Sequence, residues 1–261
     1  MSTGRGPNPL FVAWTVYRAQ RVARPRPAGE TIADHEALGV ELKTLRREGI
    51  SVLPSRRSRL AAYRDYLETL DPDGMNKDEA LAYWLNLYNA GALTLAADAT
   101  EMGKGSVLRV PGAFTRSWAR VAGVPLSLTE IEHGKVRRFQ DPRIHGALVC
   151  GSASCPNLRF EPFTGAELDD QLDDQLRNFL TLGGASIDRA RGRLLLSRIF
   201  LWYGGDFTRP DRMPTWLPPP KNRLAAAVGR WLDADTRAWV EANQPKVVFR
   251  PYDWELDCPI A

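Results

Sequence analysis

Two histidines and two cysteines with chemically useful side chains lie within one short stretch of the sequence. His133, His145, Cys150 and Cys155 all fall between positions 133 and 155, and Glu132 directly precedes His133. A thiolate that attacks, an imidazole that carries the proton and a carboxylate that orients the imidazole are the parts of a nucleophilic catalytic site. The stretch therefore predicts cysteine-dependent nucleophilic catalysis.

Cys155 is the expected nucleophile. It precedes Pro156, a pattern typical of a helix cap with proline at the first helical position, and the positive end of a helix favours a thiolate. The backbone amides of residues 151–154 could bind an oxyanion. Cys150 ends an apolar stretch, 144–150, which we expect to be a strand, so Cys150 is expected to be the more buried thiol.

His133 and His145 are both candidates for the general base. His133 lies on a helix that is expected to start at Ser127, because a serine followed three residues later by a glutamate matches a capping box. His145 begins the predicted strand. The group that orients the imidazole is either Glu132 or Asn89.

The same residues allow two other interpretations. His133, His145, Cys150 and Cys155 are ligand types that zinc favours, but their five-residue steps are wider than the spacing of zinc knuckles. Free cysteines are also common core residues, which would make the cluster structural. The sequence contains neither a phosphate-binding glycine loop nor a dinucleotide fingerprint. We therefore expect no metal and no other cofactor.

The helix predicted over residues 78–93 is apolar on nearly every face, which is typical of a central, buried helix. Asn86 and Asn89 lie three residues apart on one face of it. A buried amide costs free energy unless it is hydrogen-bonded. Such an amide either orients a catalytic histidine or ties the helix to a neighbouring loop. Arg137 and Arg138, in contrast, are expected on a solvated face.

Helical and strand patterns alternate along the rest of the chain. Helices are predicted within 30–70, 164–182 and 222–243, and a hairpin over 187–196 turns at Arg191-Gly192. This mixture predicts one α+β domain over residues 60–257, with a central buried helix and surrounding helices packed on a small, mostly antiparallel sheet. Residues 1–59 are expected to form an N-terminal extension with helical segments.

The composition of the 261 residues excludes several classes of protein. Hydrophobic residues make up 44% and charged residues 25%, as in ordinary globular domains. No run approaches the ~20 apolar residues of a membrane span, and a formal charge of +4 is too dispersed for a nucleic-acid surface. The N-terminus lacks a secretory signal pattern, and three cysteines cannot form a fully paired disulfide framework. We expect a cytoplasmic protein without nucleic-acid partners, whose segment 11–22 could dock on the domain or on a protein partner.

Several segments, in order, resemble the domain of unknown function 547 family. They read ALAYWLNLYNA at 80–90, LSLTEIEHG at 126–134, DPRIHGALVC at 141–150, SCP at 154–156, IFLWYGGDF at 199–207 and YDW at 252–254. The resemblance covers about residues 60–257. It implies that a set of polar residues is typical of the family: Asn86, Asn89, Glu132, His133, His145, Cys150 and Cys155. A papain-like or transglutaminase-like arrangement is a plausible analogy, and the order of histidine before cysteine would then require a permuted arrangement.

From these observations we expect a cysteine-dependent acyl-transfer enzyme, acting as an amidase, peptidase or transferase on an amide or thioester. Its substrate would be a small molecule or a peptide. The alternative is a non-catalytic binding module in which the polar cluster only holds the core together.

Overall fold

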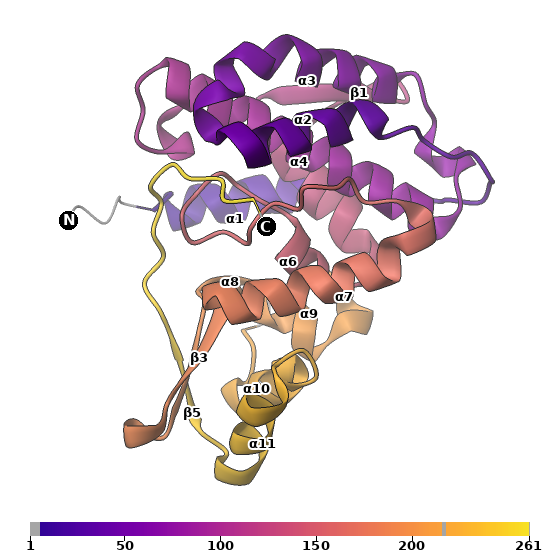
Figure 1. Ribbon diagram of the computed structural model, residues 1–261. Helices are drawn as coiled ribbons and strands as arrows, with labels where there is room; N and C mark the ends of the chain where they lie inside the picture. The colour runs from indigo at the N-terminus through magenta and orange to yellow at the C-terminus, as the bar shows by residue number, and fades with distance from the viewer. Residues whose placement is uncertain (1–5, 216–217, 261) are drawn as a thin grey trace.

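Helix α4, Lys77–Glu101, runs through the middle of the upper part of the protein in the computed structural model, which describes residues 6–215 and 218–260 (Figure 1). The side chain of Asn76 begins the helix by accepting hydrogen bonds from the backbone N–H groups of Asp78 and Glu79. Nearly every residue of α4 is buried. A Cβ at Gly91 would come within 2.5 Å of the Leu128 side chain, so any other residue would force a neighbouring side chain to shift. The predicted central helix is therefore confirmed.

Ten further helices and five strands surround α4 in the described part of the chain. The helices are α1 (Pro9–Ala19), α2 (Glu36–Glu48), α3 (Leu53–Glu68), α5 (Leu128–Glu130), α6 (Ile144–Ala147), α7 (Leu168–Phe179), α8 (Ile199–Trp202), α9 (Gly204–Thr208), α10 (Lys221–Gly229) and α11 (Ala234–Asn243). The strands are β1 (Ser117–Val121), β2 (Val124–Ser127), β3 (Ala185–Asp188), β4 (Arg193–Leu196) and β5 (Lys246–Phe249).

The strands form two small sheets. β1 and β2 pair as an antiparallel hairpin, while β3, β4 and β5 form a mixed sheet in which β3–β4 is antiparallel and β4–β5 is parallel. Gly192, with φ +59°, supplies the left-handed residue of the β3–β4 turn, as expected for the predicted hairpin. The predicted α+β class is confirmed.

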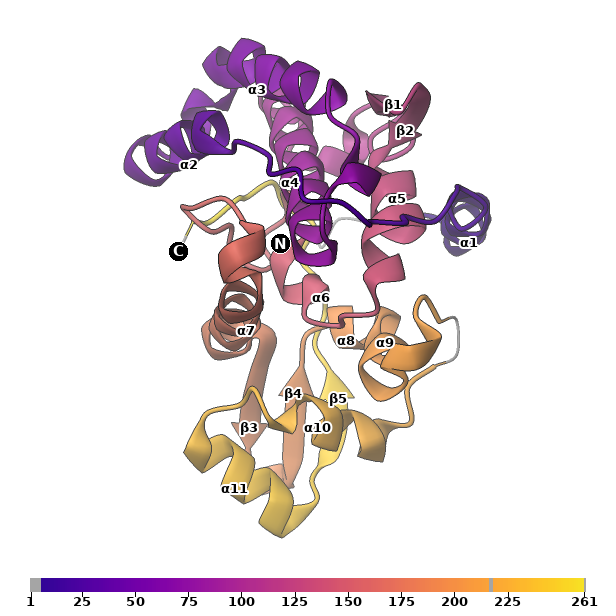
Figure 2. The ribbon, with the colours of Figure 1, turned by 90° about the vertical axis from the view of Figure 1, so that its right-hand side faces the viewer.

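Two hydrophobic cores lie one above the other (Figure 2). The upper core surrounds α4 and includes the hairpin β1–β2, and the lower core lies between the mixed sheet and helices α8–α10. Helix α7 belongs to both, because Leu168 and Leu172 pack into the upper core and Leu176 and Phe179 into the lower one. Elements from the two cores therefore meet beside α7.

The N-terminal extension contributes helices α1 and α2. Leu38, Leu42 and Leu45 of α2 are buried in the upper core. Helix α1 packs closer to the candidate site, where a Cβ on Gly134 would lie 2.6 Å from the carbonyl oxygen of Ala19. Within the described residues, no helix has the length and apolarity needed to cross a bilayer.

Three local predictions are wrong. The apolar stretch 144–150 begins with the helical turn α6 and is extended only after it, because short apolar runs do not distinguish strand from helix. No helix starts at Cys155: the following residues pair with the C-terminal segment, through a bridge between Leu158 and Ile260. The predicted helix 222–243 is two helices, because Asp233 caps a new helix by accepting from the backbone N–H of Thr236.

Candidate active site

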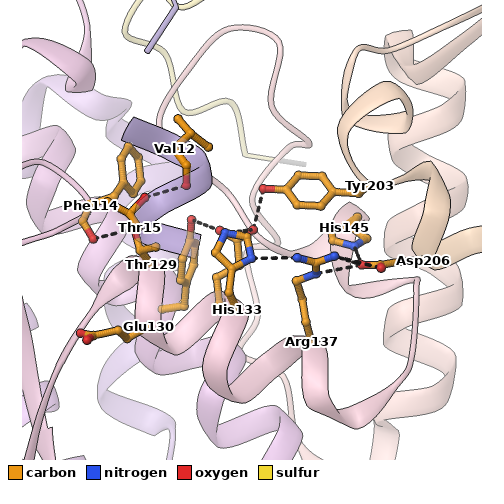
Figure 3. Close-up of polar contacts among 12 residues, drawn as sticks. Val12, Thr15, Phe114, Thr129, Glu130, His133, Arg137, His145, Tyr203 and Asp206 are labelled. Atoms are coloured by element: carbon orange, nitrogen blue, oxygen red, sulfur yellow. Dashed lines mark hydrogen bonds and ion pairs between the residues drawn. The ribbon is translucent and has the colours of Figure 1, made fainter. Parts of the chain in front are cut away.

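The candidate site consists of two polar clusters at the junction of the two cores. The histidine cluster comprises Glu132, His133, Arg137, His145, Tyr203 and Asp206 (Figure 3). The thiol cluster comprises Cys150, Ser152, Cys155 and Tyr252.

A single turn of unusual geometry carries Glu132 and His133. Ser127 and Glu130 form the predicted capping box, in which the Ser127 N–H donates to the Glu130 carboxylate at 2.8 Å. The chain then forms a π-helical turn over Ile131–Lys135. Such turns are rare and occur frequently at functional sites. The turn places Glu132 and His133 at the junction of the cores.

A buried ion pair joins Arg137, two residues beyond this turn, to helix α9. Arg137 donates to both carboxylate oxygens of Asp206, at 2.8 and 2.9 Å, and both side chains are almost wholly buried. His145 Nε2 lies 2.9 Å from the same carboxylate, and the Thr215 N–H donates to it at 3.0 Å. These donors lower the pKa of Asp206 far below its usual value, although burial opposes the shift. The expectation that Arg137 is solvated is therefore wrong, because it is the counter-ion of a buried aspartate.

The hydrogen bonds fix the tautomer of His133. Arg137 Nη1 lies 3.0 Å from His133 Nδ1. A guanidinium can only donate, so Nδ1 accepts and Nε2 carries the proton. Burial lowers the pKa of His133 to about 4, and the neighbouring Arg137 adds to this effect, against the opposing influence of Glu132. The ring is therefore neutral at pH 7, with Nε2 3.7 Å from Glu132.

Two tyrosines hold the carboxylate of Glu132. The hydroxyl of Tyr203 donates to one oxygen at 2.7 Å and that of Tyr88 to the other at 3.3 Å. Burial raises the pKa of Glu132, but the neighbouring His133 and the Tyr203 hydrogen bond outweigh it and leave this pKa lowered. The ring of Tyr203 also stacks on His145, with the ring centres 4.2 Å apart. Tyr203 therefore connects Glu132 to His145.

The two sulfur atoms of the thiol cluster are in direct contact. Cys150 Sγ lies 2.6 Å from Cys155 Sγ, and both thiols are free. The hydroxyl of Tyr252 is 3.2 Å from Cys155 Sγ, and Ser152 Oγ is 3.5 Å from it. The backbone N–H of Cys150 also donates to Cys155 Sγ at 3.1 Å. Cys155 therefore accepts from several donors at once.

These contacts separate the acidities of the two thiols. Burial opposes ionisation of Cys155, but hydrogen bonds from Cys150, Ser152 and Tyr252 lower its pKa to about 6. The hydrogen bond to Cys155 raises the pKa of Cys150, and burial raises it further. One proton is thus held on Cys150 and shared with a Cys155 thiolate. Side-chain hydrogen bonds, not the helix end expected from Pro156, stabilise this thiolate.

The C-terminal segment holds the loop between the two cysteines. The backbone N–H groups of Ala153 and Ser154 donate to the carbonyls of Glu255 and Asp253, and that of Cys155 donates to Ser152. The amides of Ala153 and Ser154, two of the four expected to bind an oxyanion, are therefore already used inside the protein. The hydroxyls of Ser152 and Tyr252 are the donors that remain beside the sulfur.

The two clusters lie next to each other without a direct hydrogen bond between imidazole and thiol among the described residues. Tyr88 links them, because it donates to Glu132 and lies close enough to Cys150 and Cys155 for their charges to raise its pKa, in addition to the effect of burial. Cys150 is partly exposed and Cys155 is only 9% exposed. A hollow of about 510 Å³, lined among others by Asn76, lies elsewhere on the surface.

Asn89 and Asn86 both tie helix α4 to neighbouring backbone. Asn89 donates to the carbonyl of Ala147 and accepts from the N–H of Val149, so it fixes the chain directly before Cys150. Asn86 makes the same pair of bonds to Phe163. In the described structure, therefore, the hydrogen bonds of both amides go to backbone groups and not to an imidazole.

Sequence reasoning missed five side chains of the clusters, namely Arg137, Ser152, Tyr203, Asp206 and Tyr252. Tyr203, Asp206 and Tyr252 stand in segments quoted for the family resemblance, which was the available signal. Among the described residues, no group of three or more His, Cys, Asp or Glu side chains has the arrangement of a metal site.

The comparisons with known proteins gave a match to a family model over part of the chain. Neither the curated proteins nor the solved structures gave a match. Residues 72–180 match the family described as protein of unknown function, DUF547. This segment carries Asn89, Glu132, His133 and both cysteines of the thiol cluster, whereas Tyr203, Asp206 and Tyr252 lie beyond it. Over residues 72–180, which are less than half of the chain, the protein is similar to the DUF547 family.

Proposed function

We propose that the chain is a cysteine-dependent acyl-transfer enzyme in which Cys155 attacks the carbonyl carbon of an amide or thioester. The observation that carries the proposal is the set of hydrogen-bond donors around the Cys155 sulfur, from Cys150 and Tyr252 among others, which lowers its pKa to about 6. A thiol with this pKa is mostly ionised at pH 7, and the thiolate is the attacking form.

The thiol cluster supplies the other groups that the first step needs. The attack gives a tetrahedral oxyanion, and the hydroxyls of Ser152 and Tyr252 lie beside the sulfur to donate to it. The leaving amine or thiolate takes a proton, and the C–N or C–S bond of the substrate breaks. Water or a second acceptor then attacks the acyl-enzyme and releases Cys155.

The histidine cluster has a separate place in this proposal. Neither imidazole hydrogen-bonds to a thiol, so the thiolate does not depend on them. His145 is oriented by Asp206 through Nε2, which leaves Nδ1 as the ring's acceptor. His145 is the base proposed for deprotonating the acceptor in the second step, with Asp206 as its orienting group, because His133 Nδ1 already accepts from Arg137.

The test compares Cys155→Ala with Cys258→Ala. Cys258 is also buried, and burial raises its pKa, so it has no thiolate at neutral pH. Both variants are assayed for release of thiol or amine from a panel of acyl thioesters and peptide amides, and for thermal melting. The proposal predicts that only Cys155→Ala loses turnover, with an unchanged melting temperature.

The alternative, a non-catalytic binding module, makes the opposite prediction. The completely bonded ion pair of Arg137 and Asp206 and the amide of Asn89 are consistent with a purely structural role. A wild-type protein without turnover on any member of the panel, together with a lower melting temperature for Cys155→Ala, would favour that alternative.

A further inference from the structure

The contact between Cys150 and Cys155 is closer than the mechanism above requires. The two sulfur atoms are 2.6 Å apart, whereas a disulfide bond is about 2.05 Å long. Acyl transfer needs only one nucleophilic thiolate, and Cys150 serves it only as a hydrogen-bond donor, a role that Ser152 and Tyr252 share. Two thiols in contact can also be oxidised together to a disulfide.

The loop that joins the two cysteines is shaped to keep them together. Gly151 has φ +77°, a conformation that favours glycine, and the Cys155 N–H closes the turn on the Ser152 carbonyl at 2.9 Å. A Cβ at Gly151 would lie 3.1 Å from Val107. The bridge between Ser152 and Leu256 fixes the loop from its other side. A bond between the sulfurs therefore needs only a small movement.

We propose that Cys150 and Cys155 form a redox-active dithiol that hydrogen peroxide converts to an intramolecular disulfide. The site is only narrowly open, since Cys155 is 9% exposed and Cys150 is partly exposed. A small oxidant such as a peroxide suits this opening. The proposal concerns the same Cys155 thiolate as the proposed function, but the oxidation does not depend on acyl transfer.

The reaction has two steps. The Cys155 thiolate attacks one oxygen of hydrogen peroxide, the O–O bond breaks, and a sulfenic acid and hydroxide form. The hydroxide takes a proton from solvent and becomes water; the hydroxyl of Tyr252, 3.2 Å from the sulfur, lies where it can relay that proton. The Cys150 sulfur then attacks the Cys155 sulfur, and the hydroxyl group leaves with the Cys150 proton as a second water. The two thiols lose two electrons, and the peroxide gains them.

The residues that surround the pair support these roles. Cys150, as the protonated partner in contact with Cys155, is the resolving thiol. Cys258 makes no hydrogen bond to either sulfur within the described structure, and burial raises its pKa. It is therefore expected to stay reduced under conditions that oxidise the pair.

The experiment treats the full-length protein with hydrogen peroxide and follows its thiols by mass spectrometry. The wild type is expected to lose two titratable thiols through a Cys150–Cys155 disulfide, which dithiothreitol reverses, while Cys258 stays free. In Cys150→Ser the resolving thiol is absent, so dimedone should label a sulfenic acid on Cys155. The matched control Cys258→Ser should form the disulfide as the wild type does.

Two results would overturn the proposal. One is a wild-type protein whose Cys155 is oxidised to sulfinic acid as fast as in Cys150→Ser, because Cys150 would then not resolve the sulfenic acid. The other is peroxide-treated wild type that keeps all three thiols. Both readouts are independent of turnover, so they stand even if Cys155→Ala shows that the acyl-transfer proposal is wrong.

Discussion

Replacing Asp206 by asparagine should destabilise the protein strongly, because this carboxylate is the only counter-ion that the described structure gives the buried Arg137. Asp206 has an exposed fraction of 0% and accepts hydrogen bonds from Arg137, His145 and the Thr215 backbone. The side-chain nitrogen of the new asparagine cannot accept a hydrogen bond, so the donors that face it lose their acceptor. Removing one member of a buried ion pair costs about 3–5 kcal/mol. At ~2–4 °C per kcal/mol for a chain of this size, the melting temperature should fall by roughly 6–20 °C.

The assay is urea unfolding at pH 7, followed in parallel by far- and near-ultraviolet circular dichroism, since coincident curves justify a two-state analysis. Asp211→Asn is the matched control, because Asp211 is exposed and lies outside the cluster. The double variant Arg137→Met/Asp206→Leu, which removes both charges, should be more stable than Asp206→Asn. A loss below about 1 kcal/mol for Asp206→Asn, or an equal loss for Asp211→Asn, would show that the ion pair does not stabilise the junction.

Three further predictions follow from the described contacts. Burial lowers the pKa of both His35 and His133 to about 4, so between pH 6.5 and 4 the unfolded chain binds protons that the folded chain does not. The free energy of unfolding should therefore fall by about 2 kcal/mol for each histidine between pH 7 and 5. Denaturation curves that show no loss of stability over this range would contradict the buried neutral rings. Asn89→Ala removes two buried hydrogen bonds to residues 147 and 149 and should lower the free energy of unfolding, measured with urea, by about 2–4 kcal/mol. An unchanged free energy of unfolding would mean that water replaces the amide. Gly134→Ala would place a Cβ 2.6 Å from the Ala19 carbonyl oxygen, so α1 should detach and become accessible to limited proteolysis. A cleavage pattern like that of the wild type would show that α1 shifts without detaching.

Helix α4 could be predicted from the sequence because the residues that specify it all lie within one continuous segment. An apolar run on every helical face has no other stable location than a core, and the cap at Asn76 lies in the same segment. The capping box at Ser127 and the hairpin around Gly192 are local in the same way. Each of these features needs only a few consecutive residues to specify it.

The organisation of the site could not be predicted, because its partners come from distant segments. Arg137 lies 69 positions from Asp206, and nothing in the local sequence distinguishes a buried arginine from a solvated one. The effect of Tyr252 on Cys155 acts across 97 positions. The helix expected at Pro156 does not form because the C-terminal segment pairs with this stretch instead. Residue types therefore identified the chemistry, while tertiary contacts decided which groups touch.

The most direct test of the account is the pH dependence of the alkylation of Cys155 by iodoacetamide in the native protein, followed by peptide mass spectrometry. Hydrogen bonds from its neighbours lower the pKa of this thiol to about 6, so the alkylation rate should rise with a midpoint near pH 6 and be nearly constant above pH 7. Tyr252→Phe removes one of the donors and should move the midpoint upward. A wild-type midpoint at the usual thiol value of about 8.5 or above would contradict the stabilised thiolate, and both proposals for Cys155 with it.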